Sequence, residues 1–153
     1  MPQIMTASWF AKLPPGAAPV GISRGVPRSK AGYQRLHELE PGPWFRSVSP
    51  EQYLTRYRQI LDRLDPGVIR DQLLDYGDVP VMLCWEAARD CHAGSKWCHR
   101  HLVAQWLEDR LGIEVPEVGF PTLDRFAFLK KFGVQVPSYL VQSHPAARKQ
   151  RLR

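Results

Sequence analysis

Apolar positions gather in short runs near the start of the chain and return at helical spacing further along. Residues 4–10 and 20–23 are short apolar runs that stop at prolines, glycines or charged residues, which is typical of strands. Residues 79–83 form an uninterrupted apolar run, as expected for a strand with both faces buried. Residues 114–118 are a further candidate. The pattern therefore predicts strands spread over most of the chain.

Apolar residues recur at helical spacing in four segments: residues 49–64, 65–77, 98–112 and 122–132. The first segment begins with Ser49 and Pro50, and Gln52 completes a capping box. Asp65 starts the second helix by the same logic, and Gly112 ends the third. Apolar residues show no regular spacing in residues 29–48 or in the polar stretch that precedes residue 98, so we predict loops there.

Strands and helices follow one another in an order that is typical of a mostly parallel sheet covered on both faces. The 153 residues suffice for about one domain, and the fourteen prolines argue against a helical bundle. We therefore predict a small, Rossmann-like α/β domain of three layers, with a mostly parallel sheet and helices on both faces. We place this domain at residues 1–140 and a basic, flexible tail at residues 141–153.

The net charge of +6 and the pI near 9.5 permit an anionic partner. Four basic residues crowd the last six positions: Arg148, Lys149, Arg151 and Arg153. Such a tail either binds nucleic acid or is a solvated end. No apolar run approaches the roughly 20 residues that span a bilayer, and the N-terminus lacks a signal-peptide pattern. We therefore expect no membrane partner and a cytoplasmic location.

Three cysteines, an odd number, argue against a disulfide framework and favour thiol chemistry, metal binding or simple burial. All three lie within residues 79–112. Cys84 and Glu86 stand where the apolar strand leaves the sheet, and their alternation places them on one face. Cys98 opens the helix that follows. Open α/β sheets bind ligands at the carboxyl ends of their strands, so we predict a site here.

Each residue of this predicted site has a functional and a structural interpretation. Unpaired N–H groups at the helix start, with His99 and Arg100 nearby, would stabilise a Cys98 thiolate as nucleophile or metal ligand. Cysteine is equally one of the most frequently buried residue types. Glu86 is suited to act as a general acid or base, or to pair with Arg100 as a structural anchor.

Arginines near the same sheet edge suggest an anionic substrate. Ser23 and Arg24 end the second predicted strand, so they would reach the edge where Cys84 and Glu86 lie. Arg24 would then hold an anionic group together with Arg100, whose rigid guanidinium suits phosphate or carboxylate. The alternative is that Ser23 and Arg24 form an ordinary surface turn.

Zinc ligands of the right type are present, but their spacing is poor. The candidates are Cys84, Cys91, His92, Cys98 and His99. They contain no C-x-x-C or H-x-x-x-H pair, and adjacent residues on a helix point about 100° apart. A closed zinc site would need Cys84 and Cys98 joined by Cys91 or His92. We therefore predict no metal ligand in the site and retain zinc as an alternative.

Several short motifs occur in a fixed order along residues 4–117. They are Ile22-Ser23-Arg24-Gly25 with Pro27, Asp65-Pro66 after a helix, Leu83-Cys84-Trp85-Glu86, and Cys98-His99-Arg100 followed by Val103-Ala104 and Trp106-Leu107. In this order they resemble the bacterial and phage domain-of-unknown-function family 488. The resemblance implies a small Rossmann-like domain without an established activity, and its motif residues are Ser23, Arg24, Cys84, Glu86, Cys98, His99 and Arg100. Cys91 and His92 depart from the family pattern, which weakens a shared role for them.

Together these observations favour an enzyme that acts on a nucleotide, nucleic acid or similar anionic substrate. Its predicted catalytic residues are Cys84, Glu86, Cys98 and His99, and its predicted substrate-binding residues are Ser23, Arg24 and Arg100. The first alternative is a non-catalytic nucleic-acid-binding module in which the motif is structural or binds zinc. A third possibility is a redox switch formed by Cys84 and Cys98.

Overall fold

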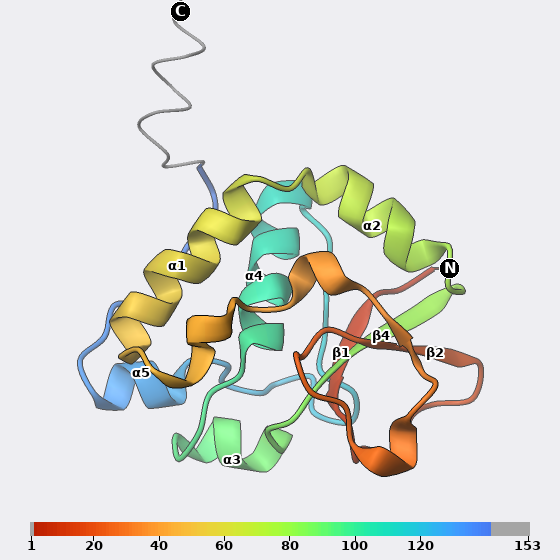
Figure 1. The fold of residues 1–153 in the computed structure, drawn as a ribbon, viewed down its shortest axis with the longest axis horizontal. Helices are drawn as coiled ribbons and strands as arrows, with labels where there is room; N and C mark the ends of the chain where they lie inside the picture. Colours follow the sequence, from red (N-terminus) through yellow and green to blue (C-terminus); the bar gives the residue numbers. More distant parts are fainter. Residues whose placement is uncertain (1, 142–153) are drawn as a thin grey trace, which may run out of the picture.

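The fold is built on a parallel sheet, which a computed structural model describes within residues 2–141. The strands are β1 (Met5–Ser8), β2 (Ala17–Gly21), β3 (Gln34–Arg35) and β4 (Val79–Cys84). They form one four-stranded sheet in the order β1-β4-β2-β3, in which every pairing is parallel (Figure 1). The predicted α/β class is confirmed.

Within residues 2–141, five α-helices and three 3-10 helices accompany these strands. The α-helices are α1 (Pro50–Asp62), α2 (Pro66–Leu74), α3 (Ala88–Ala93), α4 (His99–Leu111) and α5 (Ala127–Lys131). The 3-10 helices are η1 (Arg28–Lys30), η2 (His37–Leu39) and η3 (Pro43–Arg46). The predicted capping box closes the start of α1 in both directions, between Ser49 and Gln52, and the Asp65 carboxylate accepts two N–H groups at the start of α2.

The two faces of the sheet carry separate cores. Val20, Ile22 and Met82 pack with the buried faces of α1, α2 and α4, which lie together on one side of the sheet (Figure 1). Ala7, Trp9, Val81 and Leu83 form the second core, which connecting segments around η1 and after Val115 cover. The domain therefore has three layers. No helix in the described part of the chain is long and apolar enough to cross a membrane.

Four predicted elements differ from the structure. Strand β3 lies in the predicted loop 29–48, and α3 lies in the predicted polar loop before residue 98. Residues 114–118 make only an isolated bridge from Glu117 to Thr6, because Pro116 has no N–H to extend a ladder. The last helix begins at Ala127 rather than at Thr122. The predicted basic tail, apart from Val141, lies outside the described residues.

Candidate functional site

A pocket of about 520 Å³ opens beyond the carboxyl ends of β2 and β4, the sheet edge at which we predicted a site. Its lining includes six of the seven predicted site residues: Ser23, Arg24, Cys84, Glu86, Cys98 and His99. Arg100 does not belong to the lining. Six of the seven residues thus lie together at one pocket, and their assignment to a functional site stays a prediction.

Three of these residues meet on the wall of the pocket. Cys84 is the last residue of β4, and His99 is the first residue of α4. The Cys84 Sγ lies 3.2 Å from the His99 Nδ1. The sulfur of Cys98 joins them, so that the three potential ligand atoms all lie within 4.8 Å of one another. We call Cys84, Cys98 and His99 the Cys-His cluster.

Cys98 enters this cluster because it is not inside the helix. It occupies the N-cap of α4 with an extended backbone, at φ −142° and ψ 140°. The predicted divergence of about 100° between neighbouring helical side chains applies only within a helix. The change of backbone conformation at Cys98 therefore lets its thiol and the His99 imidazole converge, and the argument from helical spacing against their joint use was wrong.

The imidazole of His99 is held from two sides. Its Nε2 donates to the Ile22 backbone carbonyl at 2.8 Å, and its ring meets the Tyr57 ring edge to face at 5.5 Å. A proton fixed on Nε2 leaves the Nδ1 lone pair facing Cys84. Because Ile22 directly follows β2 and Tyr57 belongs to α1, the sheet and a helix together set the orientation of this ring.

The two thiols of the cluster have opposite acidities. Burial raises the pKa of Cys98, but a hydrogen bond from Cys84 and the charge of Arg100 outweigh it and bring the pKa well below its usual value. Burial, together with the hydrogen bond to Cys98, raises the pKa of Cys84 well above its usual value. The two thiols are tightly coupled, and Cys98 is the more acidic of the pair.

Glu86 stands beside the cluster, half-buried in the lining of the pocket. Burial raises the pKa of its carboxyl, and the negative charge of Cys98 raises it further. A carboxyl with a raised pKa at a pocket wall is suited to give and take protons. The alternative interpretation, an ion pair between Glu86 and Arg100, does not occur in the structure.

Arg100 pairs with Glu117 instead. Its Nε and Nη2 donate to the two carboxylate oxygens of Glu117 at 3.1 and 2.8 Å, and the Arg100 side chain is fully buried. The same carboxylate accepts from Thr6 Oγ1 at 2.7 Å and His101 Nε2 at 2.9 Å. The predicted substrate clamp by Arg100 is therefore not formed: its guanidinium lies in a buried network and acts on the cysteines through its charge alone.

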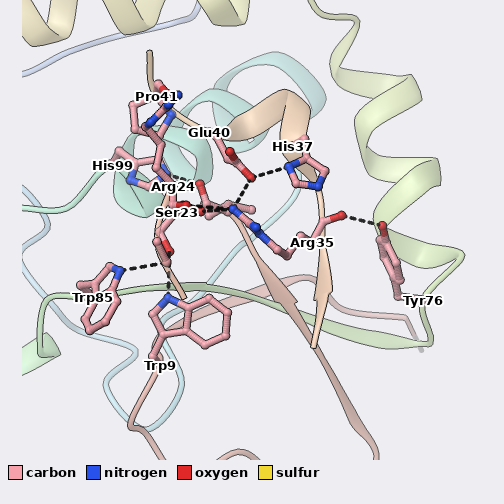
Figure 2. A network of polar contacts seen from close by, with 12 residues as sticks. Trp9, Ser23, Arg24, Arg35, His37, Glu40, Pro41, Tyr76, Trp85 and His99 are labelled. Atoms are coloured by element: carbon pink, nitrogen blue, oxygen red, sulfur yellow. Dashed lines mark hydrogen bonds and ion pairs between the residues drawn. The ribbon is translucent and has the colours of Figure 1, made fainter. Parts of the chain in front are cut away.

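Ser23 and Arg24 take different positions at the pocket. Figure 2 shows Ser23 between two tryptophans: its hydroxyl accepts from Trp9 Nε1 at 2.9 Å and donates to the Gly25 carbonyl at 2.6 Å. Trp85 Nε1 donates to that same carbonyl at 3.0 Å. Ser23 therefore holds the loop after β2 in shape. Arg24 is exposed at the rim, where its Nη1 donates to the Pro41 carbonyl at 3.2 Å.

Sequence reasoning missed part of the pocket wall. Arg46, from η3, adds a second cation to the lining, and Tyr53 and Trp97 add an aromatic pair whose ring centroids are 4.6 Å apart. Tyr53 has the helical spacing of a core residue and is indeed buried, so its sequence context carries no signal for the site. Arg46 lies in the predicted long loop, whose length was the one available sign of function.

Cys91 and His92 do not complete a metal site. Cys91 is buried against the other two cysteines, but its sulfur is not among the three clustered ligand atoms. His92 is exposed, and its Nδ1 accepts the backbone N–H of Asp124 at 2.9 Å. The closed zinc site considered from the sequence, which needed one of these residues, is therefore not formed by the described part of the chain.

No protein-family model, no curated protein and no solved structure matches this chain.

Proposed function

We propose that this protein is an enzyme that acts on a nucleotide, a nucleic acid or a similar anionic substrate at the pocket beyond β2 and β4. The observation that carries the proposal is the convergence of the Cys-His cluster and Glu86 on one pocket whose rim carries Arg24 and Arg46. Reactive groups and anion-binding groups that share one concave site are the usual layout of a catalytic centre.

Each residue of the pocket has a proposed role that follows from its position. The Cys-His cluster is the reactive centre, and Glu86 carries protons to and from the reacting groups. Arg24 and Arg46 hold the anionic part of the substrate at the rim. Ser23 keeps the loop of Arg24 in place through its bonds to Trp9 and Gly25. Arg100 contributes a positive charge from behind the cluster.

The test compares the wild-type protein with Cys98→Ser on a panel of nucleotides, phosphate monoesters and short single-stranded and duplex nucleic acids. Released phosphate and shortened products are the measured quantities. We expect turnover of at least one substrate by the wild type and its loss in Cys98→Ser, while the circular dichroism spectrum and the melting temperature stay close to those of the wild type. Full activity of Cys98→Ser would contradict the proposal.

Cys91→Ser is the matched control, because Cys91 is a buried cysteine of the same cluster of sulfurs that does not line the pocket. We expect this variant to keep its activity, whatever it loses in stability. If Cys91→Ser and Cys98→Ser lose activity in parallel with their stability, the thiols are structural rather than catalytic.

A specific observation favours one alternative, a non-catalytic nucleic-acid-binding module. Cys84, Cys91 and Cys98 pack together as a buried cluster, which is also how cysteines contribute to a core. In that case Cys98→Ser would lower the melting temperature, no substrate would turn over, and binding to nucleic acid would weaken steeply with salt.

A further inference from the structure

We infer that the Cys-His cluster is a zinc site in which Cys84 Sγ, Cys98 Sγ and His99 Nδ1 are the three protein ligands and the fourth position faces the pocket. What a bound ion would do in catalysis rests on the proposed function, but the site itself does not. The inference is carried by the separation of the ligand atoms, by the support of the imidazole and by the place of the three residues on the pocket wall.

The ligand atoms are already near the separations that zinc requires. A tetrahedral ion with Zn–S bonds of about 2.3 Å and Zn–N bonds of about 2.0 Å holds its ligand atoms roughly 3.5–3.8 Å apart. The Cys84 Sγ and His99 Nδ1 are 3.2 Å apart, and no pair in the cluster exceeds 4.8 Å. Shifts of about 1 Å or less, within the reach of a cysteine side chain, bring the set to tetrahedral geometry.

The imidazole has the outer support that metal-binding histidines usually show. Such a histidine donates its second ring N–H to a carboxylate or a backbone carbonyl, which fixes both the tautomer and the ring orientation. His99 does so at 2.8 Å to the Ile22 carbonyl, and the Tyr57 ring packs against it. The Nδ1 lone pair is therefore directed at the thiols before any ion binds.

Charge selects the kind of ion. Cysteine binds zinc as the thiolate, so with an ion bound both sulfurs are negatively charged and the divalent cation cancels the two charges. Sulfur and imidazole ligands favour zinc and similar ions over magnesium or calcium, which prefer oxygen.

The site is open on one side. Cys84, Cys98 and His99 all line the pocket, although each side chain is itself buried. Structural zinc sites use four protein ligands, whereas catalytic sites keep three and leave a position for water or substrate. A Cys2His set on a pocket wall has the second arrangement, and the open position would face Glu86 and the anionic group held by Arg24.

The experiment uses the 153-residue chain without an affinity tag, with zinc chloride and cobalt chloride as probes. After dialysis against a weak chelator, elemental analysis should find about one zinc ion per chain, and cobalt should give a sulfur-to-metal charge-transfer band with tetrahedral visible bands. Cys84→Ser, Cys98→Ser and His99→Ala should each weaken binding by more than the roughly 10–100-fold that loss of an outer partner costs. Cys91→Ser should keep the wild-type affinity and spectrum.

The inference is overturned if the wild-type chain takes up neither ion, or if cobalt binds without the charge-transfer band. It is equally overturned if Cys91→Ser loses as much affinity as Cys98→Ser. The cobalt spectrum of the wild-type protein tests the site by itself. The test therefore does not depend on whether the ligand variants fold. Zinc binding without turnover of any substrate would contradict the proposed function but support the zinc site. Turnover by a protein that binds no metal would contradict the zinc site but support the proposed function.

Discussion

The Nδ1 of His99 lies 3.2 Å from the Sγ of Cys84, and this contact joins the first residue of α4 to the last residue of β4. Both residues stand at the ends of regular elements with buried cores, so the contact does not depend on a loop. Sites built on rigid elements keep their geometry better than sites on loops. The side of the pocket that carries the Cys-His cluster is therefore set by the fold itself, while the cationic rim comes from the connections after β2 and before α1.

Glu117→Gln should destabilise the protein strongly. The carboxylate is the partner of the fully buried Arg100 and also accepts from Thr6 and His101, so its loss removes the ion-pair partner of a buried guanidinium. Removing one partner of a buried pair costs about 3–5 kcal/mol in the free energy of unfolding. Urea denaturation followed by circular dichroism measures this loss.

The matched control for that variant is Asp71→Asn, which breaks the exposed ion pair with Arg70. Exposed pairs contribute about 0–1 kcal/mol, so Asp71→Asn should unfold almost as the wild type does. A Glu117→Gln protein as stable as Asp71→Asn would show that the buried network does not hold the domain together.

Stability should fall as the pH is lowered from neutral, because of the same network. Burial alone would raise the pKa of Glu117, but hydrogen bonds from His101 and Arg100 lower it from 4.5 to about 2. Near pH 4.5 the unfolded chain therefore binds a proton at Glu117 that the folded chain does not bind. The contribution of Glu117 to the free energy of unfolding is lost as the pH falls from about 4.5 towards 2.

His101 acts in the same direction at higher pH. Burial lowers its pKa from the ordinary 6.5, so below that pH the unfolded chain binds a proton that the folded chain does not. Urea midpoints measured between about pH 8 and pH 3 should therefore decline in two steps. Glu117→Gln should reduce the lower step without abolishing it, because Glu108 contributes as well: burial raises the pKa of Glu108, but its hydrogen bond from Arg125 outweighs burial and lowers that pKa. A wild-type midpoint that stays constant over the whole range would contradict both assignments.

The elements that sequence predicted well are those with strong local signals. The capping residues Ser49 and Asp65 mark the starts of α1 and α2, and the uninterrupted apolar run of β4 marks a buried strand. Because parallel strands end at one edge, the residues after β2 and β4 had to meet there. This geometric rule alone predicts that Cys84 and Glu86 lie near Ser23 and Arg24.

The missed features depend on contacts between distant segments. Strand β3 has only two residues and exists through its pairing with β2, and α3 lacks a side-chain cap at Ala87. The carboxylate partner of Arg100 was misjudged for the same reason. Glu117 reaches Arg100 because its segment bridges to Thr6 of β1, and no spacing along the chain reveals this bridge.

Gly21→Ala should destabilise the domain and disturb the loop of the pocket. A Cβ at Gly21 would lie 2.6 Å from the Trp9 ring, which is itself fully buried and donates to Ser23. Overpacking of this kind costs about 1–3 kcal/mol. Thermal melting measures the loss. Gly25→Ala is the control, because its Cβ would lie 3.8 Å from Trp85, an ordinary contact, and equal losses in the two variants would refute the explanation.

Arg24→Gln should weaken the binding of anions without changing the fold. Arg24 is exposed at the pocket rim, and losing a charged hydrogen bond of about 1.5–3 kcal/mol should lower the affinity for inorganic pyrophosphate or adenosine monophosphate about tenfold or more. Trp85, which lines the same pocket, provides the fluorescence signal for the titration. Arg28→Gln removes an exposed charge outside the pocket, so this variant should bind anions like the wild type. Equal losses in both variants would mean that the anions respond to net charge and not to this pocket.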